Sequence, residues 1–130
     1  MTREEGEALI KRFLRLMEER DLDTANTLIA PDAKILFPGG KVFGSQAEMV
    51  AASKGRYHWV KKTFDHLDSA ETADGDVVIY IMGTLYGVNM HGVEFSGIRY
   101  IDRFVIRDGL IVSQEVWNDL AETGVLHQKA

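Results

Sequence analysis

The sequence predicts an α+β fold in which a cone-shaped, curved antiparallel sheet packs on three N-terminal helices. Helical periodicity of apolar residues is confined to residues 1–55. From Tyr57 onwards, long runs rich in β-branched and aromatic residues are divided by turn signals. Helices followed by a long meander of strands are typical of α+β domains. A sheet of long strands curls as it twists, so we expect the helices to cover its concave face and an unfilled end to form a pocket.

The composition indicates one globular domain that spans residues 1–130. With 45% hydrophobic and 27% charged residues, the chain can build a core that needs no metal or disulfide. The absence of cysteine excludes a disulfide scaffold, a thiolate nucleophile and a cysteine zinc site. A net charge of −5 argues against nucleic-acid binding and against docking on anionic membranes.

The N-terminal segment is charged and has no apolar stretch of the kind found in secretory signals. No apolar run approaches the roughly 20 residues that a membrane span needs. We therefore expect a cytoplasmic protein.

The first helix is predicted from a capping box, in which Thr2 and Glu5 satisfy each other's backbone N–H groups. The apolar residues that follow fall at helical spacing: Ala8, Leu9, Phe13, Leu16 and Met17. A shorter second helix is predicted from Asp21 to Ile29. We expect Pro31 to end it, because the residue before a proline is displaced from the α region.

A short hairpin and a third helix are predicted next. Residues 34–37 and 41–43 form the two short strands, joined by a Pro-Gly-Gly turn. Ser45 and Glu48 repeat the capping-box pattern and open a helix that runs to about Lys54, where Gly55 stops it.

Four long strands complete the chain, near residues 59–72, 77–88, 93–107 and 110–118. The turn signals between them lie at 73–76, 89–92 and 107–109, and each contains a glycine. Such short connections predict an antiparallel meander.

Three stretches of the chain resemble a known family. They are residues 21–33 with the Phe-Pro-Gly-Gly run at 37–40, residues 97–111, and the closing Val-Trp-Asn-Asp at 116–119. Together they resemble the SnoaL-like branch of the nuclear transport factor 2-like superfamily over nearly the whole chain. The resemblance implies a conical pocket at the open end of the sheet and a homodimer formed through the outer sheet face. Because the superfamily contains cyclases, isomerases, hydrolases, dehydratases and transport factors, the fold leaves the function open.

The resemblance also implies a catalytic role for Asp102. In SnoaL-like cyclases an aspartate in the penultimate strand, seven residues before the turn glycine, is the acid/base, and Asp102 stands in that relation to Gly109. Asp102 also lies near the place of the protonated acid of ketosteroid isomerases, although the isomerase base and tyrosine have no match here. The Asp-Arg-Asp set of the epoxide hydrolases is not supported by strand parity.

Strand alternation places Asp102 on an apolar face. Side chains 98, 100, 102, 104 and 106 share one face, and the arginine-rich alternate set is the natural solvent or dimer face. An inward carboxylate must be paired, hydrogen-bonded or neutralised, and a raised pKa would suit it to proton abstraction next to a carbonyl. Asp102 is therefore either a general acid or base, or a structural aspartate bonded to a neighbouring Tyr, His or Arg.

The substrate-binding candidates are large side chains near the predicted pocket. Tyr80 and Met82 share one strand parity and line either the cavity or the dimer face. Trp117 is either a pocket wall or part of the core, and Asp119 is either a second carboxylate at the mouth or a helix cap. His66 shares parity with Lys62 and could face inward. The full set of candidates is Tyr100, Phe104, Tyr80, Met82, Trp117, His66 and Phe37.

No cofactor or metal is expected. The four histidines, at 58, 66, 91 and 127, include no pair with convincing ligand spacing. The glycines at 39, 40 and 44 lack the lysine and helix context of a phosphate-binding loop.

Three functional hypotheses follow from the sequence. The first is a cofactor-independent isomerase, cyclase or dehydratase that acts on a small apolar, ring-bearing substrate, with Asp102 moving the proton and Tyr100 or Tyr80 donating to the oxyanion. The second is a binding module that uses the same pocket without chemistry. The third is a dimeric interaction protein whose pocket is filled.

Overall fold

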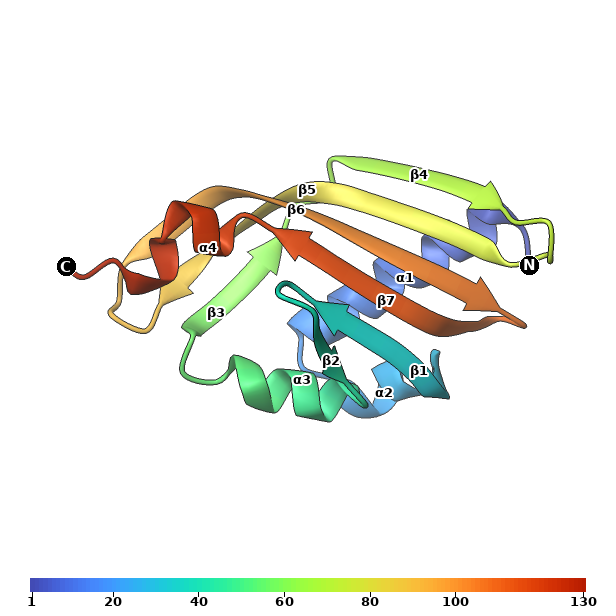
Figure 1. Cartoon of the computed structure of the whole chain (residues 1–130), viewed down its shortest axis with the longest axis horizontal. Coiled ribbons are helices and arrows are strands. Elements are labelled where there is room, and N and C mark those ends of the chain that lie inside the picture. The colour runs from blue at the N-terminus through green and yellow to red at the C-terminus, as the bar shows by residue number, and fades with distance from the viewer.

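The computed structural model describes residues 1–130. Four α-helices, seven strands and one 3₁₀ turn follow one another along the chain (Figure 1). In order they are α1 (Arg3–Glu18), α2 (Leu22–Asn26), β1 (Ile29–Phe37), β2 (Lys41–Phe43), α3 (Gln46–Ser53), β3 (Tyr57–Lys62), β4 (His66–Glu71), β5 (Val77–Asn89), β6 (Glu94–Arg107), β7 (Leu110–Asn118), α4 (Leu120–Thr123) and η1 (Val125–His127).

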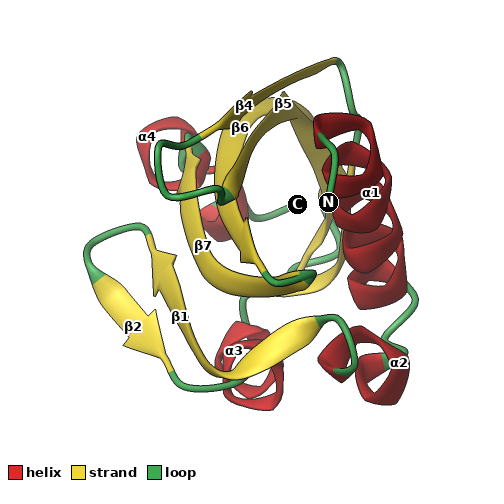
Figure 2. Ribbon diagram, turned by 90° about the vertical axis from the view of Figure 1, so that its right-hand side faces the viewer, coloured by secondary structure: helices red, strands yellow, loops and turns green.

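The strands form one curled sheet in the order β2-β1-β7-β6-β5-β3, and β4 also pairs with β5. Figure 2 shows the sheet curving into an open half-barrel, with α1 lying along its open side. The α+β class and the curved sheet predicted from the sequence are thus confirmed. None of the helices combines the length and the apolar character that a membrane span requires.

The first predicted capping box forms in full, and the second forms only in part. Thr2 and Glu5 make the reciprocal capping box at the start of α1. Ser45 accepts a hydrogen bond from the Glu48 N–H at the start of α3, but the Glu48 carboxylate reaches back to the N–H of Gly44 rather than to that of Ser45.

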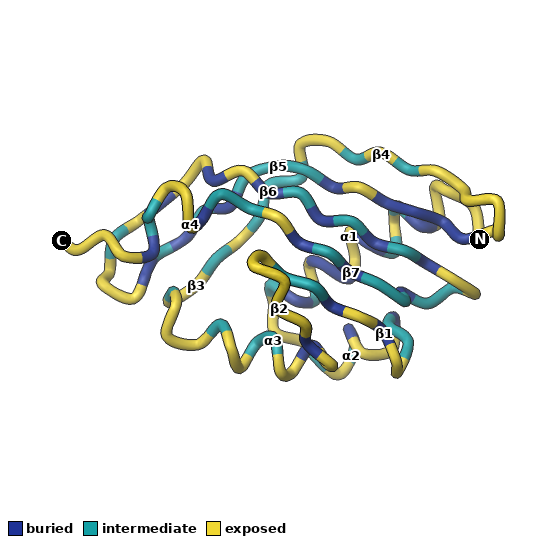
Figure 3. The backbone as a smooth tube through the Cα atoms, in the orientation of Figure 1, coloured by how far each residue is buried: buried dark blue, intermediate teal, exposed yellow.

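The core lies between α1 and the concave face of the sheet, where the buried segments of β5 and β6 concentrate (Figure 3). Phe13 of α1 packs edge-on against Phe104 of β6 at a centroid separation of 5.9 Å. Gly6 allows the first turns of α1 to approach β5 closely, because an added Cβ would lie 2.9 Å from a methyl of Val77.

The sheet is mixed rather than wholly antiparallel, because β1 runs parallel to β7. Strand β1 is also longer than predicted: α2 ends at Asn26, and Pro31 lies inside β1 instead of ending the helix. The pairing of β1 with β7 is interrupted between Ile29 and Lys34. This interruption accommodates Pro31, which has no N–H to give to a strand ladder.

The predicted strand 59–72 is divided into β3 and β4, both of which pair with β5. Lys62 pairs with Leu85, whereas His66 pairs with Met82. Between these two pairs there are four residue steps along β3–β4 but only three along β5, so residues 63–65 contain one extra residue. The extra residue reverses which face of the sheet the following side chains point to. Lys62 therefore faces the concave side and His66 does not.

Candidate functional site

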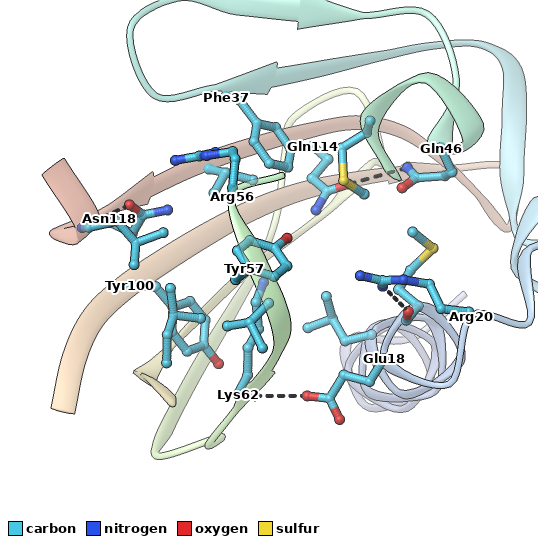
Figure 4. Close-up of a pocket in the computed structure, with 17 residues that line it drawn as sticks. Glu18, Arg20, Phe37, Gln46, Arg56, Tyr57, Lys62, Tyr100, Gln114 and Asn118 are labelled. Carbon is cyan, nitrogen blue, oxygen red and sulfur yellow. Dashed lines mark hydrogen bonds between the residues drawn. The ribbon is translucent and has the colours of Figure 1, made fainter. Parts of the chain in front are cut away.

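A cavity of about 110 Å³ lies on the concave side of the sheet, between the end of α1, the start of α3 and strands β3, β6 and β7 (Figure 4). Ten of its seventeen lining residues are hydrophobic, so its interior suits a largely apolar ligand. The lining residues are Leu14, Met17, Glu18, Arg20, Phe37, Gln46, Met49, Arg56, Tyr57, Val60, Lys62, Leu85, Tyr100, Gln114, Val116, Asn118 and Leu120.

Strand β6 sets the polar centre of this region. Its side chains alternate, and the five predicted to face inward are all buried. Tyr100 keeps 4% of its surface exposed and lines the cavity, whereas Asp102 is fully buried and lies outside the lining set. The inward orientation of Asp102 agrees with strand parity, but the cavity itself does not reach its carboxylate.

Asp102 is held by Lys62 of β3. The Lys62 Nζ lies 2.5 Å from Asp102 Oδ2, and the Lys62 side chain is 20% exposed and lines the cavity. The other carboxylate oxygen, Oδ1, is buried and has no hydrogen-bond partner. The partner predicted for a structural Asp102 was a Tyr, a His or an Arg, and the structure supplies a lysine instead.

Burial raises the pKa of the Asp102 carboxyl above its ordinary value, and the charge and hydrogen bond of Lys62 oppose that rise only in part. A carboxylate with a raised pKa is a stronger proton acceptor. The Asp102 carboxyl therefore accepts a proton more readily than an exposed aspartate does, at a position one hydrogen bond from the edge of the cavity.

Tyr100 adds an aromatic wall beside the pair. Its ring lies 4.7 Å from the Lys62 Nζ, within the range of a cation–π contact. The phenol O–H donates a 2.6 Å hydrogen bond to the backbone carbonyl of Thr63. Burial, together with the charge of Asp102, raises the pKa of the Tyr100 phenol, which keeps it neutral. The Tyr100 hydroxyl is therefore oriented by the backbone and commits its proton there.

Gly83 makes this arrangement possible. It pairs with Tyr100 across β5 and β6, and a Cβ at this position would lie 2.3 Å from the Thr63 carbonyl oxygen. Only a residue without a side chain lets the extra residue at 63–65 bring that carbonyl over the sheet to meet the phenol.

Glu18, at the end of α1, is the one acidic side chain in the lining. Its Oε1 pairs with Arg15 at 2.8 Å, and its Oε2 accepts a 2.8 Å hydrogen bond from the backbone N–H of Lys62. Both oxygens are thus engaged, and Glu18 fixes β3 against α1 rather than offering a free base.

Two buried amides lie elsewhere on the cavity wall. Gln46, at the start of α3, is 1% exposed, and Gln114 of β7 is 4% exposed. The Gln46 Nε2 donates a long, 3.4 Å hydrogen bond to Gln114 Oε1, and the Gln46 Oε1 has no partner. Such an under-satisfied pair provides hydrogen-bonding capacity next to the cavity.

Of the predicted substrate-binding residues, only Tyr100 and Phe37 line this cavity. Phe104 is fully buried in the core against Phe13 and takes no part in the lining. The position of Phe104 follows from its strand parity, but it lies further along β6, where α1 fills the concave face.

Tyr80, Met82, Trp117 and His66 lie on the other side of the sheet. Ile79 and Ile81 of β5 are fully buried, so the residues that alternate with them point outward. Tyr80 is 38% exposed, Trp117 is 46% exposed, and His66 is also exposed. Trp117 pairs with Ile101, which in turn pairs with Met82. These side chains therefore belong to the convex face and do not meet the cavity.

Asp119 does not cap α4 through its side chain. Instead its carboxylate pairs with Arg99 at 2.6 Å on the convex side. All four histidines are exposed, and the chain has no cluster of three His, Cys, Asp or Glu side chains arranged to hold a metal.

Several cavity residues were not identified from the sequence: Lys62, Gln46, Gln114, Arg20 and Arg56. For Lys62 a signal existed, because it alternates with Val60, which also lines the cavity. An isolated lysine in a strand is usually solvated, and nothing in the sequence shows that Asp102 lies within hydrogen-bonding reach of it.

The fold and the cavity define a class of protein: a curled sheet that encloses a small-molecule pocket against N-terminal helices. The SnoaL-like domain model matches residues 10–114, and the chain belongs to this family. A search of curated proteins gave no match.

Solved structures share the fold over nearly the whole chain. TerC co-crystallised with polyporic acid aligns with a TM-score of 0.78 at 16% identity, covering 95% of this chain and 99% of TerC. An NTF2-like protein of unknown function from Burkholderia pseudomallei gives 0.77 at 17% identity, with 98% and 100% coverage. A putative polyketide cyclase from Xanthomonas campestris gives 0.67 at 14% identity, with 95% and 98% coverage. At these identities the likeness establishes the fold alone.

Proposed function

We propose that the chain binds a small, mainly apolar, ring-bearing carbonyl compound and transfers a proton on it without a cofactor, as an isomerase, cyclase or dehydratase. The observation that carries the proposal is the pair formed by fully buried Asp102 and Lys62, whose amine borders a mainly hydrophobic cavity. Family membership supports the same class of function, because structures of this fold include a putative polyketide cyclase.

Lys62 is the member of the pair that touches the substrate. The proposed reaction starts from the form of the pair in which Asp102 carries the proton and Lys62 presents a neutral amine to the cavity. The C–H bond next to the substrate carbonyl breaks, its proton passes to this amine, and its electron pair moves onto the carbonyl oxygen. The new ammonium then stabilises the enolate oxygen beside it.

The fate of the enolate sets the reaction class. Return of the proton to a different carbon completes an isomerisation, and its transfer to a departing hydroxyl releases water. Attack of the enolate carbon on a second carbonyl closes a ring, and the proton then goes to the new alkoxide. In each case Asp102 acts through Lys62, as a positioning and charge-setting residue.

The size of the cavity limits the substrate. A cavity of about 150 Å³ in another protein accepts benzene, and the cavity here measures about 110 Å³. The enclosed part therefore suits no more than about one ring, and any further ring would extend through the mouth.

The test is enzyme-dependent deuterium exchange. Single-ring ketones and diketones that bind, as judged by saturation-transfer NMR, are incubated with the protein in D₂O, and loss of the α-proton signal is followed. We expect exchange above the buffer rate, reduced about 100-fold or more by Lys62→Met.

The matched control is Lys61→Met, because Lys61 is the exposed neighbour on the other face of β3. Asp102→Asn should shift the pH profile of exchange, which a merely structural role would not do. Binding without exchange above buffer in any bound ketone would overturn the enzymatic proposal.

One observation favours a non-catalytic binding module as the second candidate. Lys62 is the one cavity-facing group of this polar centre that is available for proton transfer, because Tyr100 is bonded to Thr63 and both Glu18 oxygens are engaged. On that alternative Lys62 only fixes the ligand oxygen, and Lys62→Met weakens affinity while exchange stays at the buffer rate.

A further inference from the structure

Two arginines at the mouth of the cavity have no ionic partner. Arg20 and Arg56 are both exposed and both line the cavity, and neither forms a salt bridge within the chain. The Arg56 side chain makes no hydrogen bond at all, whereas the Arg20 Nη1 donates to the Met17 carbonyl. Each guanidinium has five N–H donors, so most of this donor capacity is unused.

The charges around the cavity do not balance. The positive charge of Lys62 is matched by Asp102, and the negative charge of Glu18 is matched by Arg15. The charges of Arg20 and Arg56 remain, which gives the mouth an excess of positive charge in a chain whose net charge is −5. Against that acidic background, this local excess would attract and orient an anion.

The backbone at Arg20 provides independent support. The end of α1 forms a Schellman motif, in which the Asp21 N–H bonds the Leu16 carbonyl and the Arg20 N–H bonds the Met17 carbonyl. The residue at this corner adopts a left-handed conformation, with φ +61°, where glycine is the favoured residue. An arginine here bears conformational strain, and its side chain lines the cavity (Figure 4). Strained positions of this kind concentrate at binding sites.

Arg56 lies at the mouth of the cavity on a different segment from Arg20, which follows α1. It lies between α3 and β3, directly after Gly55, and shares the walls of two adjoining cavities with Phe37, Met49 and Tyr57. An apolar wall next to a free guanidinium suits a ligand that joins a ring to an anionic group.

We infer that the natural ligand is a ring compound bearing a carboxylate, with its ring in the apolar cavity and its carboxylate held at the mouth by the positive charge of Arg20 and Arg56. This inference rests on the pocket function proposed above and adds the charge of the ligand to it. Guanidinium groups match carboxylates in geometry as well as in charge.

The experiment compares two isosteric single-ring probes, benzoate and benzamide, by amide-detected NMR titration of the full chain at low ionic strength. We expect benzoate to bind about tenfold more tightly than benzamide. In the double variant Arg20→Gly with Arg56→Gln, the ratio should fall to about one, because a neutral mouth does not distinguish the probes. Arg12→Gln is the matched control, since it removes one exposed positive charge of α1 away from the cavity and should preserve the preference.

The single variant Arg20→Gly separates binding from folding. Because glycine is the residue the motif favours, this variant should keep or raise the melting temperature while it weakens benzoate binding. Equal binding of the two probes by the wild type, or a benzoate preference that survives in the double variant, would overturn the inference and leave the proposed pocket function standing. Failure of both probes to bind would overturn the pocket function together with the inference.

Discussion

Lys62→Met isolates the energetics of the buried pair. The substitution keeps the length of the side chain but removes the only partner of Asp102, whose second oxygen already lacks one. Removing one member of a buried ion pair costs about 3–5 kcal/mol, because the remaining charge has no compensation. Against a typical stability of about 5–15 kcal/mol for a domain, this loss is large.

The pH dependence of the loss follows from the raised pKa of Asp102. Because the folded state binds this proton more tightly than the unfolded state, the stability contributed by Asp102 is present at pH values below about 3.9 and is lost as pH rises through the folded pKa. Lys62 lowers the pKa of the Asp102 carboxyl, so removing Lys62 raises that pKa further. The pH range over which the stability contributed by Asp102 is lost then extends further towards neutral pH. We therefore expect the Lys62→Met defect to be larger at about pH 8 than at about pH 5.

Urea unfolding monitored by circular dichroism across this pH range measures the effect. Lys61→Met should unfold like the wild type, and the double variant Lys62→Met with Asp102→Asn should recover most of the loss, because no charge is then left buried. A defect that is independent of pH, or a double variant as unstable as Lys62→Met alone, would refute this reasoning.

Three further predictions concern the surroundings of the pair and the convex face. Tyr100→Phe should lower the free energy of unfolding in urea by about 1 kcal/mol, because it removes the hydrogen bond to Thr63. It should not reduce the rise in tyrosinate absorbance near pH ~10, because the buried Tyr100 phenol does not ionise there, and a smaller rise would contradict this. Gly83→Ala should destabilise the fold by about 2 kcal/mol or more by displacing the Thr63 carbonyl, whereas Gly44→Ala, with ordinary contacts, should be near neutral; equal effects would refute the assignment. We propose a homodimer through the convex face, where Trp117 is exposed; Trp117→Glu should then sediment as a monomer, and a wild-type monomer would disprove the dimer.

Local patterns predicted the elements that depend on neighbours in sequence. The Thr2–Glu5 capping box needs only a three-residue spacing, and it forms. Alternation along β6 likewise placed Tyr100 and Asp102 on the concave face, because side-chain direction in a regular strand is fixed by parity.

Features that depend on long-range pairing could not be predicted in this way. The parallel pairing of β1 with β7 joins segments from opposite ends of the chain. The extra residue at 63–65 reverses parity within one continuous β-rich run, so Lys62 and His66 lie on opposite faces although they are four residues apart. No prediction was made for Arg20, because its left-handed conformation becomes evident only once the end of α1 is known.

Lys62 and Asp102 form a pair beside the cavity, in which burial raises the pKa of the Asp102 carboxyl. The most direct test is a carbon-detected NMR titration of the Asp102 carboxyl, assigned with Asp102→Asn. We expect its pKa to lie well above the unperturbed value of about 3.9, and to rise further in Lys62→Met. A pKa at or below about 3.9 would show a solvated or firmly ion-paired aspartate, and it would contradict the proposed proton-transfer role.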